Sequence, residues 1–332
     1  MKETLESKIK FDGETFAALK MQFADQLLFQ GFTNPKLNKQ FEDSTIIYHY
    51  ANVDTFLKII KGQSLYFTNL FYLNDKVELK YGIELIKKSL VEIKPRYPLI
   101  VDLIYQHLEK NLTTDKFVFC TSKNGDLLEQ WRAYGDNGRG ISIGFKNHNL
   151  KSCLYGVING THLDYDGSYQ ISKFQEITNQ HIAFFEKYKD EVDWGKYRYE
   201  EMVAISVMEF SDFLLDSTKH SSFVNENEYR LTYKRRDNGR LKIHYRDKGK
   251  TQIPFINIPT KAGRYKQEKE MGKHSDMGAD PVFVVDKLPI KKIILGPCFD
   301  EMELTALKKQ LIVNGYSDVQ IIKSDIPYRI DF

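Results

Sequence analysis

Cysteine is scarce in this sequence, and its copies stand far apart. Cys120, Cys153 and Cys298 are the three cysteines among 332 residues, and none belongs to a C-x-x-C pair. An odd, widely spaced set argues against a disulfide framework and against a zinc site built from thiolates. We therefore expect the chain to work in a reducing compartment.

Long apolar runs and a dominant charge sign are also missing. No stretch approaches the roughly 18 apolar residues of a membrane span, and residues 1–8 hold no apolar core of a signal peptide. Lys and Arg number 48 against 45 Asp and Glu, a net charge of +3. This balance excludes a bulk polycation, so any contact with nucleic acid has to be local. These absences predict a cytoplasmic protein without a membrane partner.

The glycine-rich signatures of the common nucleotide-binding folds are absent as well. No G-x-G-x-x-G follows a predicted strand, and no G-x-x-x-x-G-K-[ST] occurs. The Rossmann and P-loop folds therefore lose support. Short strands interleaved with helices of uneven length favour an α+β fold with a mixed, mostly antiparallel sheet and helical insertions.

Periodicity gives the expected organisation of the chain. Apolar residues at steps of three and four predict an N-terminal helix, which a polar linker joins to the rest, together covering 1–44. Residues 45–332 are predicted to form one α+β domain with helical insertions at about 76–113 and 168–217, the second interrupted near Trp194. The range 261–278 is rich in Lys, Gly and Glu, which predicts an exposed loop.

The expected strands are short and numerous. Period-two alternation or a brief apolar run marks each of them. They cover 46–50, 65–68, 117–120, 139–145, 228–233, 240–245, 253–258, 282–285, 290–295 and 319–322. Shorter helices are expected over 54–60, 127–134 and 301–314.

What the sequence has in excess is Phe and Tyr, with 22 and 20 copies beside 2 Trp. Half-exposed tyrosines suit either a ligand-lined cleft or a tyrosine-rich surface. The first cluster is Tyr48-His49-Tyr50, at the end of a predicted strand and just before a helix. Its imidazole suits a hydrogen bond to a ribose, with the rings covering a base. Ordinary packing of an edge-strand histidine is the alternative.

The most informative segment is the late pair Glu226 and Glu228. Two positions apart on a predicted strand, their side chains share a face. Neighbouring carboxylates repel and raise one pKa, which costs stability unless a partner or substrate uses the pair. The alternative is a solvated edge strand with Arg230 as a salt-bridge partner.

Three further segments each allow two interpretations. Trp131 beside Tyr134 and a glycine-rich turn could wall a cleft, or be a buried structural residue. Asn74 and Asp75 are predicted to be helix caps, and the alternative is that the carboxylates of Asp75 and Glu78 share a metal. The basic run from 234 to 246 would contact phosphates if the protein handles nucleic acid, and is otherwise a solvated hairpin end.

Several short motifs stand in a fixed order between residues 45 and 330. They are YHY at 48–50, LYF at 65–67, LNDKVE at 73–78, FCTS at 119–122, WRAY at 131–134, GISIGF at 140–145, ENEYRL at 226–231 and IILGP at 293–297. Their joint order resembles the bacterial family labelled domain of unknown function 2971. That label implies no activity.

The chain is also similar to the ADP-ribosyltransferase plan, which has a His on the first strand, a second aromatic strand and a late Glu-x-Glu. This resemblance implies an ADP-ribosyltransferase-like sheet core and NAD as a substrate, with no metal. The catalytic residues would be Glu228 and Glu226. The residues that would bind NAD are His49, Tyr48, Tyr50, Tyr66, Thr68, Asn74, Trp131 and Arg230. A departure is that no Ser-Thr-Ser motif follows the first strand, where LYFT stands instead.

The function implied is an NAD-consuming enzyme that transfers ADP-ribose to a protein, a nucleic acid or water. Such enzymes in bacteria often act as toxins or phage-defence effectors, which an antitoxin or regulatory protein can hold. One alternative is a non-catalytic nucleotide- or protein-binding module of a bacterial defence system. Another is a nuclease that uses Asp75, Glu78 and Glu228 around Mg²⁺.

Overall fold

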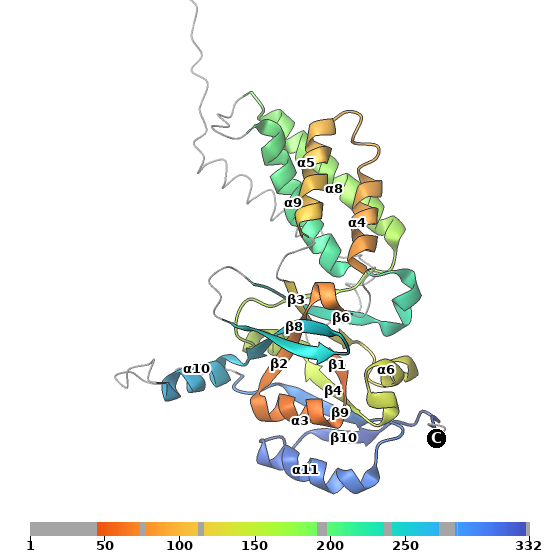
Figure 1. Cartoon of the computed structure of the whole chain (residues 1–332), viewed down its shortest axis with the longest axis vertical. Coiled ribbons are helices and arrows are strands. Elements are labelled where there is room, and N and C mark those ends of the chain that lie inside the picture. The colour runs from red at the N-terminus through yellow and green to blue at the C-terminus, as the bar shows by residue number, and fades with distance from the viewer. Residues whose placement is uncertain are drawn as a thin grey trace, which may run out of the picture. The chain divides into compact units, whose positions relative to one another are not determined.

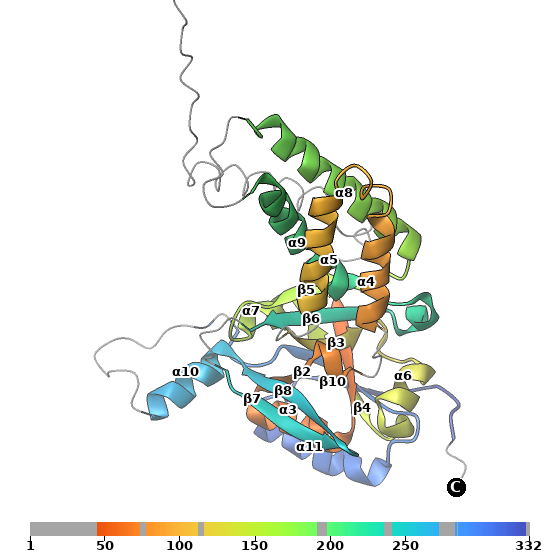
Figure 2. The same ribbon diagram turned by 45° about the horizontal axis from the view of Figure 1, so that its top comes forward.

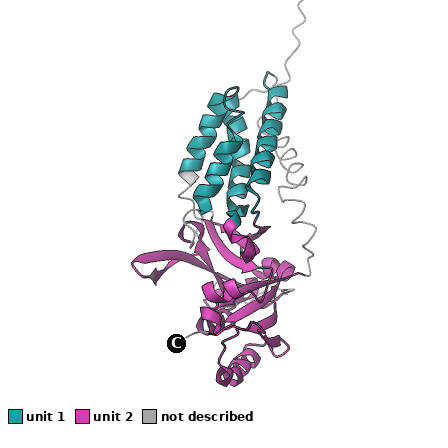
Figure 3. Ribbon diagram, turned by 90° about the vertical axis from the view of Figure 1, so that its right-hand side faces the viewer, with its two compact units in different colours: residues 1–40, 76–114, 164–221 teal, residues 41–75, 115–163, 222–332 magenta. Residues whose placement is uncertain are grey.

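The computed structural model describes residues 45–73, 78–111, 116–190, 198–235, 241–271, 283 and 285–329. The predicted N-terminal helix and its linker lie outside these residues. The described residues fall into two units (Figure 3). The helical unit takes its residues from 76–114 and 164–221, and the sheet unit from 41–75, 115–163 and 222–332.

The described residues of the helical unit form four helices, α4 (Glu78–Ser89), α5 (Pro98–Asn111), α8 (Gly167–Lys187) and α9 (Tyr199–Ser217) (Figure 1). Asp166 begins α8 by accepting hydrogen bonds from the backbone N–H groups of Ser168 and Tyr169, both at 3.1 Å. Buried apolar residues at helical spacing, such as Ile104, Phe185 and Val207, fill the space between the helices. The predicted break near Trp194 lies outside the described residues.

Ten strands of the described chain form one sheet. They are β1 (Ile46–Ala51), β2 (Ser64–Asn69), β3 (Lys116–Ser122), β4 (Ile141–Lys146), β5 (Asn159–His162), β6 (Glu228–Lys234), β7 (Ile243–Lys248), β8 (Thr251–Pro259), β9 (Ile290–Leu295) and β10 (Gln320–Lys323). Their order is β10-β9-β4-β1-β3-β2-β8-β7, and β6 pairs with β3 and β5. The described pairs are antiparallel except β9 with β10. The predicted α+β fold with a mixed, mostly antiparallel sheet is confirmed.

One face of this sheet is the apolar core. Strand residues such as Ile47, Phe119 and Ile143 pack with Phe56 of α3 (Val53–Gly62) and Leu307 of α11 (Leu304–Val313), and Figure 2 shows these two helices near each other. The other helices of the sheet unit are α6 (Leu128–Ala133), α7 (Asn147–Cys153) and α10 (Lys261–Glu270), with 3-10 turns at η1 (Leu70–Tyr72), η2 (Asp136–Gly138), η3 (Ser221–Glu226) and η4 (Glu301–Glu303). In the described ranges no helix has the length and apolarity to cross a membrane.

Two local predictions were wrong. The range 261–278 was expected to be a loop, but Lys261–Glu270 is helix α10, which begins after Thr260. The Thr260 hydroxyl accepts a hydrogen bond from the Gly263 N–H at 3.1 Å. Lys, Glu and Gln favour helices even where nothing is buried, so a polar composition does not imply a loop. In the expected strand 282–285, the described residues Phe283 and Val285 are not in a strand.

Candidate functional site

The hydrogen-bonded ladder along one edge of β3 is interrupted near the middle of the strand. Strand β6 pairs with the whole of one edge of β3, from Lys116 to Ser122. Strands β1 and β2 therefore share the other edge, where Tyr48 faces Ser122 and Thr68 faces Val118. Between these two positions the ladder is open, and we call this gap the split.

His49 occupies the split. Its Nδ1 lies 2.9 Å from the Cys120 carbonyl oxygen, and its ring centroid lies 4.2 Å from that of Phe119. A carbonyl can only accept, so Nδ1 carries the proton and Nε2 is left as an acceptor. Burial lowers the pKa of His49 to about 4, the positive charge of Arg246 acts in the same direction, and the Cys120 hydrogen bond opposes them. The imidazole is therefore neutral at pH 7, and its orientation is fixed.

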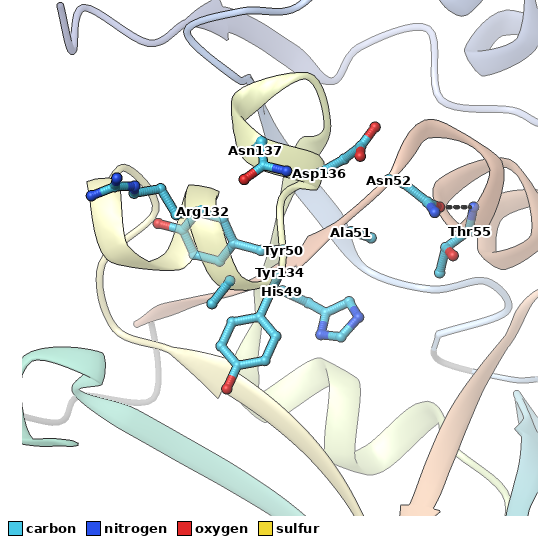
Figure 4. A pocket seen from close by; sticks show the side chains of 10 residues that line it. His49, Tyr50, Ala51, Asn52, Thr55, Arg132, Tyr134, Asp136 and Asn137 are labelled. Atoms are coloured by element: carbon cyan, nitrogen blue, oxygen red, sulfur yellow. Dashed lines mark hydrogen bonds between the residues drawn. The ribbon is translucent and has the colours of Figure 1, made fainter. Parts of the chain in front are cut away.

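A pocket of about 410 Å³ lies at the end of β1 (Figure 4). It is lined by His49, Tyr50, Ala51, Asn52, Thr55, Arg132, Ala133, Tyr134, Asp136 and Asn137. These residues come from the end of β1, the start of α3, and the turn that connects α6 through η2 towards β4. The pocket brings together segments that lie about 80 positions apart in the sequence.

The groups around the pocket are one cation, one carboxylate, an aromatic ring and the start of a helix. The Asn52 side chain caps α3 by accepting from the Thr55 N–H at 2.8 Å, and the start of a helix attracts negative charge. Arg132 is an exposed cation, and Tyr134, 39% exposed, offers a ring. Asp136 and Asn137 hold left-handed φ angles of 52° and 50°, which Asp and Asn tolerate better than most residues.

Two glycines allow the backbone to pass close to this pocket. A side chain at Gly140 would overlap the Ala51 carbonyl oxygen, and one at Gly296 would overlap that of Gly138. The Gly296 N–H donates to the Gly140 oxygen at 3.0 Å. Close approach of three chain segments therefore explains the glycines in the GISIGF and IILGP motifs.

Behind the pocket, the aromatic residues pack and anchor a loop. The Tyr50 hydroxyl donates to the Asn124 oxygen at 2.9 Å and accepts from the Leu127 N–H at 3.0 Å, and burial raises its pKa. Trp131 is fully buried and donates from Nε1 to Asp126 at 2.6 Å. Its ring meets that of Tyr50 edge-on, with centroids 4.8 Å apart. Trp131 is not among the pocket-lining residues, whereas Tyr50 is.

Glu228 forms a buried ion pair. Its Oε1 lies 2.9 Å from the Arg230 Nε, with 5% and 0% of the two side chains exposed. Opposite residues of an antiparallel pair share a face, and Glu228 lies opposite Ser122, which lies opposite Tyr48. His49 is one position further along β1, on the other face. The strands therefore do not bring His49 and Glu228 to one face of the sheet.

Glu226 is connected to the pocket. The Tyr134 hydroxyl donates a long hydrogen bond of 3.4 Å to its Oε1. Its backbone oxygen accepts from the Ser122 hydroxyl at 2.7 Å, which holds the end of η3 against β3. The Tyr134 hydroxyl thus connects the Glu226 carboxylate to the pocket wall.

The remaining predicted residues lie elsewhere. Thr68 accepts from Arg246 at 2.9 Å, and Tyr66 packs against Phe255, away from the residues that line the pocket. Asn74 lies outside the described residues.

The residues of the nuclease alternative are not gathered at one described site. Asp75 also lies outside the described residues. Glu78 belongs to the helical unit, with its Oε2 3.9 Å from the Lys219 Nζ, whereas Glu228 belongs to the sheet unit. No group of three His, Cys, Asp or Glu that could hold a metal occurs in the described part of the chain.

The segment from α6 to β6 contains Tyr134, Glu226 and the Glu228–Arg230 pair. Residues 130–231 match the family described as protein of unknown function (DUF2971). The DUF2971 match thus covers one wall of the pocket and both carboxylates, and His49 precedes it. No curated protein and no solved structure matches the chain. The comparisons do not support the resemblance to ADP-ribosyltransferases, which stays a prediction from the sequence.

Sequence reasoning did not assign a role to four polar residues that line the pocket, Asn52, Arg132, Asp136 and Asn137, whereas Tyr134 was predicted beside a possible cleft wall. Two signals were available for them. An Asn directly before an apolar helix marks an N-cap, and the Gly-Asp-Asn-Gly cluster at 135–138 marks a tight turn. Neither signal indicates that the two segments lie side by side in the fold. Their proximity comes from the pairing of β1 with β4, which no local signal predicts.

Proposed function

We propose that the chain is an NAD-consuming, ADP-ribosyltransferase-like enzyme that binds NAD in the pocket at the end of β1. The observation that carries this proposal is the neutral His49, whose proton is fixed on Nδ1 by Cys120 and whose Nε2 is free of that bond. A fixed, uncharged acceptor suits a ribose hydroxyl and orients the sugar without acting as a base.

The rest of the pocket supports a dinucleotide. Arg132 and the start of α3 offer positive charge for the diphosphate, and the Tyr134 ring offers a face for a base or the nicotinamide. Glu226 lies beside the pocket wall through its contact with the Tyr134 hydroxyl, whereas Glu228 of β6 is on the other face of the sheet from His49.

The proposed cleavage of the nicotinamide–ribose bond requires a carboxylate near the ribose. The bond between the ribose C1′ and the nicotinamide nitrogen breaks, its electron pair stays with nicotinamide, and the sugar becomes oxocarbenium-like. A hydroxyl of the acceptor or water then attacks C1′ and releases its proton. A fixed carboxylate stabilises the positive charge, and Glu226 and Glu228 are the candidates for this role.

The test is release of free nicotinamide by the full-length chain, with and without protein and nucleic-acid acceptors. We expect Glu228→Gln and Glu226→Gln each to slow release by about 100-fold, because a charge that stabilises the transition state is lost. Glu301→Gln is the matched control, since Glu301 is an exposed carboxylate paired with Lys323 at 2.5 Å. Absence of NAD binding and of release by free, folded protein would refute the proposal.

One observation favours the second candidate, a non-catalytic nucleotide-binding module. Glu228 is buried and paired with Arg230, so its carboxylate already has a partner. A binding module would bind NAD without releasing nicotinamide in the presence of any acceptor. Calorimetric binding measured beside the release assay separates the two functions.

A further inference from the structure

Positive charge is concentrated in one stretch of the sequence, which leads into β7. Residues 234–250 contain eight Lys and Arg against two Asp, a net charge of +6. The whole chain carries +3, so all other residues together carry −3. The chain is therefore nearly neutral as a whole but has a strong local excess of positive charge. Such an excess is typical of a surface that binds a polyanion.

The hairpin of β7 and β8, together with β2, carries a row of rings and the Arg246 guanidinium on one face. Phe255 of β8 is at its centre, with the Tyr66 ring centroid at 5.2 Å and the His244 ring centroid at 5.5 Å. The Arg246 guanidinium lies 6.0 Å from the Phe255 centroid and donates to the Thr68 hydroxyl at 2.9 Å. The register confirms a shared face, because Phe255 lies opposite both Thr68 and His244.

The row is accessible. His244 and Arg246 are exposed, and Phe255 and Tyr66 are half-buried, with their rings supported from below by the sheet. Figure 2 shows β8 and β7 as the hairpin that ends the sheet on this side. The rings and cations thus form a platform on three adjacent strands.

We propose that this platform binds single-stranded nucleic acid. Rings on a sheet face stack on unpaired bases, while Arg and Lys contact the phosphates between them. In a duplex the base faces are stacked on one another, so a duplex could bind only through contacts between its phosphates and the cations of the protein. The shared chemistry is a base stacked beside a phosphate, which RNA and single-stranded DNA both supply.

A simpler explanation for the charges is protection of an edge strand. Lys and Arg on β7 would discourage pairing with another chain, and such charges need no fixed position. Arg246, however, is held by Thr68 and by the Phe255 ring, and the aromatic residues share its face. Charges that only prevent another chain from pairing with the edge strand would not require a fixed arginine beside aromatic rings.

The platform is continuous with the face that carries Glu228. Thr68 lies opposite Val118 of β3, which lies opposite Thr232, and Thr232 shares a face with Arg230 and Glu228. If the proposed function holds, the strand bound here is the acceptor of ADP-ribose. Binding itself does not depend on NAD, so the two proposals fail separately.

The experiment is fluorescence anisotropy with labelled oligonucleotides of about 12 nucleotides, using the full-length chain without NAD. We expect single-stranded RNA or DNA to bind more tightly than the duplex of the same sequence. Phe255→Leu keeps the apolar volume but removes the ring, and Arg246→Gln removes the charge. We expect each to weaken binding about 10-fold or more, and Arg246→Gln also to reduce the salt slope by about 1.

Lys308→Gln on α11 is the matched control, because Lys308 is an exposed cation outside the platform, and we expect it to leave binding unchanged. The proposal is overturned if no oligonucleotide binds, if the duplex binds as well as the single strand, or if Phe255→Leu binds like the natural chain. It is also overturned if a poly-glutamate peptide competes as well as the oligonucleotide, which would indicate an acidic protein. Tighter binding of RNA than of DNA would assign a contact to the 2′-hydroxyl.

Discussion

Arg230→Met is expected to lower the free energy of unfolding of the sheet unit by about 3–5 kcal/mol. Arg230 is fully buried, its Nε lies 2.9 Å from the Glu228 Oε1, and Glu228 is only 5% exposed. Removing the guanidinium leaves the buried carboxylate without this cation, so the cost of desolvating its charge is less well compensated. Urea unfolding followed by the fluorescence of Trp131, which is buried in the sheet unit, measures the loss in a Trp194→Phe background.

Two control variants show whether the loss of stability comes from the buried charge that Arg230 no longer balances. The double variant Glu228→Leu with Arg230→Met removes both charges and should regain most of the lost stability. Lys58→Met breaks an exposed pair with Asp54, at 2.6 Å with side chains 56% and 72% exposed, and should cost less than about 1 kcal/mol. An Arg230→Met variant as stable as Lys58→Met would show that the pair is not a strong determinant of stability.

The same pair decides how the activity test is interpreted. A Glu228 variant that fails to release nicotinamide could be unfolded and not catalytically impaired. The double variant separates these causes, because it restores the balance of charge without restoring the carboxylate. If it is stable and still inactive, while Arg230→Met alone keeps activity, the carboxylate has a direct part in the reaction.

The sequence predicts the strands of this fold well, because alternation with period two survives in any sheet with one apolar face. Residues 46–50 and 228–233 show this, and their strands β1 and β6 begin and end within a residue of the prediction. Helix α10 was missed because its polar composition favoured a loop, and the prediction did not use its capping by Thr260. The short strand β5 has almost no apolar residues and was missed for the same reason.

The sequence does not predict which strands pair with one another. Nothing local indicates that β1 and β2 share an edge of β3, or that His49 then faces the gap between them. The alternation does indicate that Glu226 and Glu228 share a direction, but the η3 turn ends at Glu226, and Asn227 has a left-handed φ of 44°. The two carboxylates therefore have separate partners, Tyr134 and Arg230.

Acid is expected to destabilise the sheet unit through two histidines. Burial lowers the pKa of His162 to about 3, with Lys123 and Lys151 acting in the same direction, and burial lowers the pKa of His49 to about 4. Both values lie below 6.5, the ordinary pKa of an unfolded His, so the unfolded chain binds these protons first as the pH falls. Stability is therefore complete above pH 6.5 and declines between pH 6.5 and about 3–4, by up to about 3 kcal/mol for His49 and about 5 kcal/mol for His162.

Urea unfolding monitored by Trp131 between pH 7.5 and pH 4 tests this expectation. His162→Asn and His49→Gln cannot take up a proton, so each should flatten the decline, even where it lowers stability at pH 7.5. His148→Gln changes an exposed histidine and should leave the slope unaltered. Because His49 is the proposed ribose contact, its variant should also weaken NAD binding, whereas His162→Asn should not. Equal slopes in all four proteins would mean that neither imidazole is held neutral by the fold, and the fixed acceptor on which the NAD proposal depends would be lost with it.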